Sequence, residues 1–582
     1  LLVAAGALAC GSVLAPRSAA AQALAQARSR AEHRDSARTL GAAREAQARF
    51  ERVRMNHFPW TNNSWGGSCD EVVGRFCLTY GDAKDEEEEK PPPPEHEAVT
   101  EARGELIERL GAAAERLPGD GWIAGQRARY LVEAGRMEDA ITAADACRAE
   151  PAWWCTALRG YAHHAAGDYN EADSAFSLAL RQMPEKERDR WTDLSLLLTG
   201  EALKEYRRSR GAARDSLERR FWWLAEPLQM TPGNERRTEH YARHVLDRLQ
   251  TRARSTDGTS WGGDLRELLL RYGAPVAWER VRPRYPALGA DVSIVSHYPP
   301  RSREFFPSRM LHDDPTRLGP DDLPLRLDRA HTGYAPRGVA SFDVLEHQLA
   351  RFRRGDSVVV VAAYAMKPDS ARPAPLVEAG LVLSENELAR PIVVHSLRAQ
   401  PRDVLSVTMP PTAMLMSLEV RAPEGGRVAR ARYGIRLEDL PPHGVAISDV
   451  LLLTDADEPP RSLTEAMPRA RGSLRVRSGE RVGLYWEVYG VRQQTDAMRV
   501  GVTLRGSDRS WLRRLGERAG VLRADAPLAL SWNEAAAADD VLPRALAVEL
   551  PALAPGRYTL EVTVTLPGRE PLVSRRELHV EE

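Results

Sequence analysis

One segment of the chain gathers side chains that could bind or transform a ligand. Residues 261–272 carry an indole, carboxylates, guanidinium groups and a phenol, on Trp261, Asp264, Arg266, Glu267, Arg271 and Tyr272. A carboxylate beside cations suits acid–base chemistry or the binding of a charged ligand. No pair among the 82 acidic residues stands out as an acid and a base, so we nominate no catalytic residue. The candidate binding residues are Trp261, Asp264, Arg266 and Tyr272, with Glu235 upstream.

The same residues also have a structural interpretation, which we favour over catalysis. Asp264 can cap a short helix, and Glu267 three positions later would complete a capping box. Leu265, Leu268, Leu269 and Tyr272 would form one apolar stripe, and Gly273 and Pro275 would end the helix. Trp261 is large enough to anchor the preceding turn in a core.

Metal and cofactor chemistry lack their usual signatures. His240 and His244 are four residues apart and could share a metal with Glu239 or Asp247, but the H-E-x-x-H order is absent, and we expect a solvated helix face. The cysteines show no zinc spacing. The sequence also lacks G-x-S-x-G, a phosphate-binding G-x-x-x-x-G-K-[ST] and a dinucleotide-binding glycine motif. We therefore expect no metal and no cofactor.

Length and composition exclude other classes. The chain has 582 residues, which suggests about four domains. Its formal charge of −1 offers no electrostatic attraction to nucleic acid. Hydrophobic residues at 43% and charged residues at 28% are ordinary for folded proteins, so wholesale disorder is excluded.

The first residues and the cysteines indicate export. Residues 1–23 combine an apolar run with a small-residue stretch, as in a signal peptide that begins before Leu1. Cys10 follows Ala7-Leu8-Ala9, a poor lipobox, so membrane attachment is expected only if Cys10 is lipidated. Four of the five cysteines then remain, and an oxidising compartment predicts two disulfides among Cys69, Cys77, Cys147 and Cys155. Three pairings are possible, and pairing Cys69 with Cys77 and Cys147 with Cys155 encloses the shortest loops.

The N-terminal half should be helical. Within 24–84, residues 24–56 predict a helix with a solvated polar face, and an acidic and proline-rich linker covers 85–96. In 97–189 two units stand 32 residues apart: Ala128, Gly135 and Ala140 are matched by Gly160, Gly167 and Ala172, and Phe176, Ala179 and Pro184 complete the second. This resembles the tetratricopeptide repeat, whose helices cross at small residues. Ala144 replaces the aromatic residue in the first unit.

Residues 190–285 resemble another family. Phe221-Trp222, Glu226-Pro227 and Thr231-Pro232-Gly233-Asn234-Glu235 precede Ser260-Trp261-Gly262-Gly263-Asp264, an order similar to the GWxTD domain of exported bacterial proteins. Ser260 stands for the family's glycine and Gly263 for its threonine. The resemblance implies a mainly helical module, often beside tetratricopeptide repeats and C-terminal β domains, and it implies no reaction.

Proline-rich residues 286–340 predict an irregular connection, on the surface or across a neighbour. After it the hydrophobic period becomes two, as in Val482, Leu484, Trp486 and Val488, which predicts antiparallel β-sandwiches over 341–440 and 445–582. Pro567-Gly568 should turn a final β-hairpin.

The sequence thus predicts a multidomain α plus β protein with an N-terminal helical repeat, a GWxTD-like module and C-terminal β-sandwiches. These are interaction modules, so the leading hypothesis is a periplasmic or envelope-associated binding or scaffolding protein that holds a protein partner through its helical repeats. The alternative is an exported hydrolase of peptide or glycan with a site near Trp261 and Asp264. The sequence does not indicate an oligomeric state.

Overall fold

The fold is taken from a computed structural model, which divides the chain into two compact units. The first comprises Leu1–Leu196 and Arg237–Pro299, and the second Leu197–Arg236 and Pro300–Glu582. The structure describes residues 15–61, 69–78, 94–281, 293–299, 302–305, 311, 314–323, 325, 330–368, 375–424, 426–437, 440, 443–454, 457–491, 497–506, 528–535 and 539–581. Cys10, most of the expected leader and nearly all of the expected 85–96 linker lie outside these residues. Residues 190–285, expected as one module, contribute to both units.

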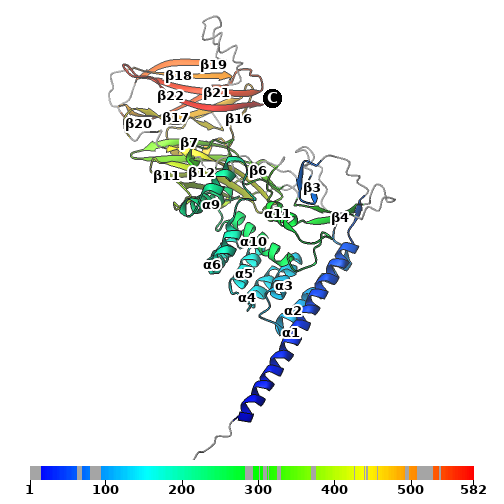
Figure 1. The fold of residues 1–582 in the computed structure, drawn as a ribbon. Coiled ribbons are helices and arrows are strands. Elements are labelled where there is room, and N and C mark those ends of the chain that lie inside the picture. Colours follow the sequence, from blue (N-terminus) through cyan, green and yellow to red (C-terminus); the bar gives the residue numbers. More distant parts are fainter. Residues whose placement is uncertain are drawn as a thin grey trace, which may run out of the picture. The chain divides into compact units, whose positions relative to one another are not determined.

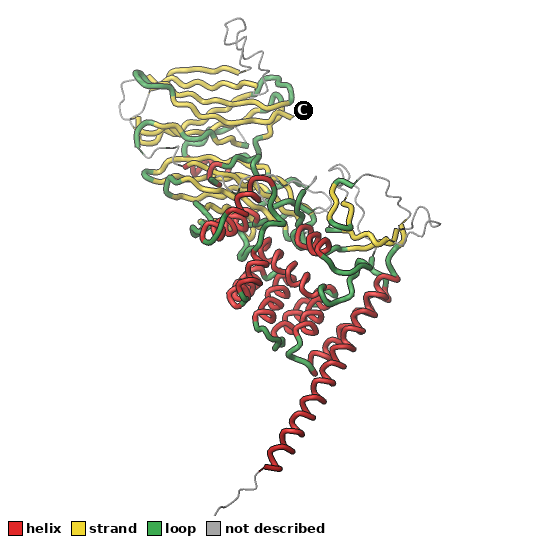
Figure 2. Tube along the Cα trace, in the orientation of Figure 1, coloured by secondary structure: helices red, strands yellow, loops and turns green. Residues whose placement is uncertain are grey.

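The first unit is mainly helical, as Figures 1 and 2 show. Its helices are α1 (Ala15–Asn56), α2 (Glu97–Arg116), α3 (Gly121–Glu133), α4 (Met137–Asp145), α5 (Trp153–Ala166), α6 (Tyr169–Gln182), α7 (Glu185–Thr192), α10 (Glu235–Gln250, from Arg237 onward) and α11 (Gly263–Tyr272). Among the described residues, no helix combines the length and apolarity that a membrane crossing requires.

Helices α1 to α6 pack each against the next along the chain. Small residues lie where the helices meet: a Cβ on Gly160 would come within 2.9 Å of the Phe176 ring. Gly135 and Gly167, at equivalent places between paired helices, have φ of +73° and +87°, which glycine adopts without strain. The 32-residue spacing seen in the sequence therefore corresponds to equivalent packing and turn positions.

The second half of α1 is not solvated on its polar face, contrary to expectation. Gln47, Glu51 and Arg54 are buried beside Phe50. The Gln47 amide donates to the Tyr130 hydroxyl at 3.0 Å, and that hydroxyl donates to Glu51 at 2.7 Å. Arg54 donates to Glu133, also on α3. Partners on α3 therefore compensate for much of the cost of burying these polar groups.

Short strands complete the first unit. They are β1 (Trp60–Thr61), β2 (Glu71–Val73), β3 (Phe76–Leu78), β4 (Ala277–Val281) and β5 (Ser293–His297). Strands β1, β4 and β5 form one sheet, and β2 pairs with β3 in a hairpin. Strand β5 falls within 286–340, so the expected irregular connection includes a regular element.

The second unit is rich in β structure. Its helical elements are α8 (Gly200–Arg208), α9 (Ala212–Ala225), α12 (Leu463–Ala466) and the 3₁₀ turns η3 (Pro315–Arg317) and η5 (Met467–Arg469). Its first strands are β6 (Ser341–Val344), β7 (Glu346–Arg354), β8 (Ser357–Ala365), β9 (Val377–Ser384), β10 (Ile392–Ala399), β11 (Arg402–Met409), β12 (Ala413–Ala422) and β13 (Arg427–Arg436). The later strands are β14 (Ala446–Ile447), β15 (Leu451–Leu453), β16 (Arg475–Arg477), β17 (Arg481–Val491), β18 (Ala497–Gly506), β19 (Leu528–Ala535), β20 (Asp539–Glu549), β21 (Gly556–Thr565) and β22 (Leu572–Glu581).

These strands form four main sheets, stacked in Figure 1. Their orders are β10-β9-β12-β13-β6, then β11-β8-β7, then β14-β17-β15 with β20 on β17, then β16-β22-β21-β18-β19. Strand β8 is buried on both faces: Val358, Val360 and Ala362 enter one apolar core, and Val361 and Ala363 enter the next. This explains its continuous apolar run, because a strand covered on both sides needs no polar alternation.

The expected coarse division, with helices first and β structure last, is confirmed. The final hairpin is also confirmed, since β21 pairs with β22 and the Arg569 N–H donates to the Leu566 carbonyl around Gly568 at φ +70°. Parts of 286–340 are buried, including Phe305 and Tyr334, which join Phe342 in a small apolar core of the second unit. This agrees with a connection that lies across a neighbour.

Candidate functional site

The five candidate binding residues do not lie together. Trp261 and Arg266 meet at one carboxylate, whereas Asp264 is bound by Arg75 of the β2–β3 hairpin. Tyr272 packs against Tyr298, just after β5, and Glu235 belongs to the second unit. Their closeness in sequence therefore does not define a single site.

Asp247 of α10 is the carboxylate that joins Trp261 to Arg266. Its Oδ1 accepts a hydrogen bond of 2.9 Å from the Trp261 indole N–H, and its Oδ2 accepts one of 2.9 Å from Arg190. Arg266 Nε lies 3.3 Å from Oδ2. The Asp247 side chain is only 4% exposed, so these cations compensate a charge withdrawn from water.

Helix α10 is buried although its sequence is hydrophilic. His240 and His244 are 1% and 2% exposed, so the expected solvated face is wrong. His240 Nε2 donates to the Trp191 carbonyl at 3.1 Å, and Glu239 pairs with Arg243 at 2.8 Å and with His164 at 2.7 Å. Burial tends to raise the pKa of Glu239, but Arg243 and His164 hold it well below its usual range.

A cavity of about 450 Å³ opens beside Asp247. Residues from α1, α5, α7, α10 and the start of α3 line it, among them Trp122, Trp154, Trp191, Arg190, His244 and Asp247. Burial, reinforced by His240, Arg266 and Arg190, holds the pKa of His244 well below its usual value. The imidazole is therefore neutral at physiological pH, and its buried Nε2 has no hydrogen-bond partner within the described part of the chain. A concave site with mixed aromatic and polar walls is the usual form of a small-molecule site.

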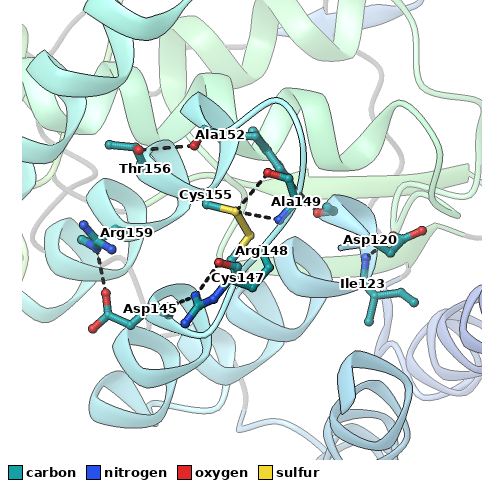
Figure 3. Close-up of a disulfide and its surroundings, with 12 residues drawn as sticks. Asp120, Ile123, Asp145, Cys147, Arg148, Ala149, Ala152, Cys155, Thr156 and Arg159 are labelled. Carbon is teal, nitrogen blue, oxygen red and sulfur yellow. Dashed lines mark hydrogen bonds and ion pairs between the residues drawn. A yellow bond between two sulfur atoms is a disulfide. The ribbon is translucent and has the colours of Figure 1, made fainter. Parts of the chain in front are cut away.

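One disulfide shapes the wall of this cavity. Cys147, just after α4, is bonded to Cys155 in α5, and the loop between them supplies Glu150, Pro151 and Trp154 to the lining. Figure 3 shows Arg148 on this loop, where it donates to the Asp145 and Cys147 carbonyls at 2.6 and 2.7 Å. The Trp154 indole donates to the Gly121 carbonyl at 2.8 Å, which ties the loop region to the start of α3.

Both locally paired disulfides are formed, which confirms that pairing. The second joins Cys69 to Cys77 across the β2–β3 hairpin, with Cα atoms 5.3 Å apart. Disulfides persist in oxidising compartments, so this is consistent with an exported protein.

Removing the cavity-wall disulfide should loosen the helical unit. The bond closes a loop with a sequence separation of 8, for which chain entropy predicts about 2–3 kcal/mol. We expect the double variant Cys147→Ala/Cys155→Ala to lose that free energy of unfolding, measured by urea titration with circular dichroism at 222 nm. A reductant should destabilise the wild type by the Cys147–Cys155 contribution plus that of Cys69–Cys77, and the variant by the latter alone. An unchanged midpoint in the variant would contradict the expectation.

Asp264 and Arg271 attach α11 to the disulfide hairpin. Arg75 donates hydrogen bonds to both carboxylate oxygens of Asp264, at 2.6 and 2.8 Å. Arg271 likewise donates to both carboxylate oxygens of Glu71, at 2.7 and 2.9 Å. The bonds from Arg75 hold the pKa of Asp264 well below its usual range. Asp264 therefore stays ionised and has no proton to donate as a general acid. Tyr272 lies beside the Arg271–Glu71 ion pair, since the Arg271 guanidinium donates to the Tyr272 hydroxyl at 2.8 Å.

The expected capping box at Asp264 is wrong. Helix α11 begins at Gly263 with Gly262 as its N-cap, and no side chain caps it. Asp264 is in the first turn, and its Oδ1 accepts from the neighbouring Leu265 N–H at 2.8 Å. Glu267 instead pairs with Arg271 at 3.0 Å. The expected end of the helix is observed, with Gly273 at φ +89°.

Glu235 takes part in a polar cluster of the second unit. Its backbone N–H donates to Glu226 at 3.1 Å, and the Tyr334 hydroxyl donates to its carboxylate. Burial raises the pKa of Glu226 well above its usual value, and the charge of Glu235 raises it further. This cluster holds the 226–235 turn in place.

Within the described ranges, no group of three or more His, Cys, Asp or Glu side chains could hold a metal ion. Sequence reasoning considered His244 and Asp247 only as metal ligands and missed Arg190, Trp122 and Trp154. Only a spatial arrangement brings these together, because they come from different helices. The one local sequence signal for this cavity was the Trp153-Trp154 pair, which lies between Cys147 and Cys155.

Comparisons with known proteins add little. No family model and no curated protein matches the chain. Among solved structures, red sea bream transglutaminase matches 41% of this chain at 12% identity with a TM-score of 0.14, and the match spans 32% of the transglutaminase. The FN1–FN3 domains of chicken CNTN1 match 42% of this chain at 9% identity with a TM-score of 0.15, over 68% of that chain. Similarities this weak carry no argument about fold or function.

Proposed function

We propose that this chain is an exported binding protein, periplasmic or associated with the cell envelope, that holds a ligand in the cavity beside Asp247. The cavity is the observation that carries the proposal. It is walled by indole rings and by polar groups from several helices, including a neutral, buried His244 whose Nε2 finds no hydrogen-bond partner among the described residues. The two disulfides support the exported compartment.

The surrounding modules support binding more than chemistry. We propose that α3–α4 and α5–α6 are tetratricopeptide-like repeats, since Gly135 and Gly167 occupy equivalent turns and Gly160 receives the Phe176 ring. We likewise propose that the four β sheets of the second unit form two sandwiches that pack face to face through the core around Val361 and Tyr485. Residues 190–285 would then be a GWxTD-like module in which the acid of the motif, Asp264, binds Arg75 of the β2–β3 hairpin.

A protein partner is proposed for the helical repeats, and such a partner could itself supply the group that enters the cavity. The alternative of an exported hydrolase gains no support from Asp264. Both of its oxygens are engaged by Arg75, and the neighbouring cavity of about 290 Å³ is lined largely by apolar residues such as Phe76, Leu265 and Leu268.

A blocked cavity tests the proposal. Thr251 is an exposed residue of the cavity lining, and its hydroxyl donates a hydrogen bond to the Asp247 carbonyl of the preceding helical turn at 3.0 Å. Thr142 is a matched control, exposed on α4 with the same bond to the Glu138 carbonyl at 2.9 Å. We expect a small-molecule library to contain compounds that raise the melting temperature of wild type and Thr142→Trp but not of Thr251→Trp.

The same variants test the partner. A protein from envelope extract that uses the cavity should be retained by wild type and Thr142→Trp and lost by Thr251→Trp. Compounds or partners that bind all three proteins equally would show that the cavity is not the binding site.

A further inference from the structure

Three of the four carboxylates that line the cavity already accept hydrogen bonds. Asp247 accepts hydrogen bonds from Trp261 and Arg190 and forms an ion pair with Arg266. Asp120 accepts from the Trp122 and Ile123 backbone N–H groups at 3.0 and 2.9 Å, and so caps α3. Glu187 accepts from the Trp191 indole at 3.1 Å. The fourth carboxylate, Glu150, is exposed on the loop between Cys147 and Cys155 and forms no ion pair with a described residue.

The donor groups are in excess. The Trp122 indole N–H is buried, and no hydrogen-bond partner for it exists in the described residues. Arg44 and Arg252, which also line the cavity, form no ion pair with any described carboxylate. Arg44 lies over the Trp122 ring at 5.6 Å. A ligand that satisfies this wall must bring acceptors.

Arg248 is the donor best prepared for a planar anion. Its guanidinium lies over the Trp153 and Trp154 rings, 4.8 and 5.0 Å from their centroids, and its nearest carboxylate is Glu187 at 3.6 Å. Stacking against an aromatic face leaves the N–H groups in the guanidinium plane available for two parallel bonds to a carboxylate.

Two further cations lie near Arg248. Burial lowers the pKa of Arg248; Glu187 opposes this, whereas Arg190 and Arg252 lower the pKa further. Arg190 and Arg252 therefore repel Arg248, and a negative charge bound at Arg248 would relieve that repulsion.

We propose, resting on the binding function above, that the ligand of this cavity is an organic carboxylate, with its carboxylate on Arg248 and its apolar body against Trp122 and Leu40. The source is a free acid or the carboxyl terminus of a peptide, since both present the same planar group on an apolar body.

A pair of isosteric probes tests the charge requirement. We expect 3-phenylpropanoate to bind the full-length protein in calorimetric titration, and 3-phenylpropanamide to bind about 10- to 100-fold more weakly, as for a lost charged hydrogen bond. Arg248→Gln should weaken the acid by a similar factor and leave the amide unchanged. Arg116→Gln, on an exposed position at the end of α2, is the control and should bind both probes as the wild type does. A short peptide with a free carboxyl terminus and its amidated form distinguish the two sources.

The outcomes separate this inference from the binding function. Equal affinity for the acid and the amide would overturn the proposal that the ligand is a carboxylate. The cavity would remain a ligand site if Thr251→Trp still blocked binding. No binding of either probe or peptide would also overturn it, and the library screen would then decide the binding function alone. Unchanged affinity in Arg248→Gln, with circular dichroism as in the wild type, would remove Arg248 from the site.

Discussion

Replacing Glu419 with leucine is expected to lower the free energy of unfolding of the β-rich unit by about 3–5 kcal/mol, because it leaves Arg432 buried without its counter-ion. Glu419 lies on β12 with its side chain wholly buried, 3.0 Å from Arg432 on β13, which is 1% exposed. Its oxygens also accept from the Gln229 and Met230 backbone N–H groups at 2.9 and 2.8 Å. One substitution therefore leaves a buried guanidinium without its carboxylate and two backbone N–H groups without their acceptor.

Hydrogen exchange of peptides 413–436 in increasing urea measures this loss. The exposed cross-strand pair Glu561–Arg575, at 2.8 Å on β21 and β22, is the matched control, and Glu561→Leu should cost less than about 1 kcal/mol. The double variant Glu419→Leu/Arg432→Leu should lose less than the sum of its single variants, since no charge is then left unpaired. Equal losses at Glu419 and Glu561 would contradict the argument. Should Glu419→Leu not accumulate, Glu419→Gln removes the charge at nearly constant shape.

Glu133→Gln is expected to lower the free energy of unfolding of the helical unit by about 3 kcal/mol at pH 7 and by progressively less as the pH falls. Glu133 ends α3, where it accepts from Arg129 at 2.9 Å and from Arg54. Burial alone would raise the pKa of Glu133, but Arg54, Arg129 and Arg103 lower it to about 2 from its ordinary value of 4.5. At ~1.4 kcal/mol per pKa unit this gives the stated magnitude.

The sign of the pH effect follows from proton binding. Between pH 4.5 and 2 the unfolded chain binds the Glu133 proton and the folded chain does not. The stabilisation is therefore complete above pH 4.5 and disappears as the pH falls towards 2.

Urea titrations followed at 222 nm from pH 7 to 3 measure the difference between the wild type and Glu133→Gln. Glu45, in an exposed pair with Arg49 at 3.8 Å on α1, is the control, and Glu45→Gln should cost less than about 0.5 kcal/mol. A difference between the wild type and Glu133→Gln that stays constant with pH would contradict the assigned cause.

Much of the secondary structure could be read from the sequence because its signals are local. Helical spacing across 97–184 and period-two alternation in β17, β18 and β21 follow from which faces must leave water. The Pro567-Gly568 turn depends only on adjacent residues. The pairing of cysteines eight residues apart follows from the short loops that it closes.

The candidate site could be predicted only in part. Trp261 and Arg266 were recognised by type, but their common partner Asp247 lies on another helix and was considered only as a metal ligand. Asp264 was expected to cap its own helix, whereas Arg75, far away in sequence, binds it. Sequence spacing shows which residues share a helix face, and it does not show what that face contacts.

The sequence by itself determined the order of helical and β regions, the paired cysteines and the absence of familiar catalytic motifs. Only the tertiary structure decided that the hydrophilic helix α10 and the polar face of α1 are interior. Their burial is compensated where charges meet partners from distant segments, as Asp247 meets Arg190 and Glu51 meets Arg129. A hydropathy scale treats every charged residue as exposed. A charge can be buried when it is paired, and pairing across the fold cannot be seen along the chain.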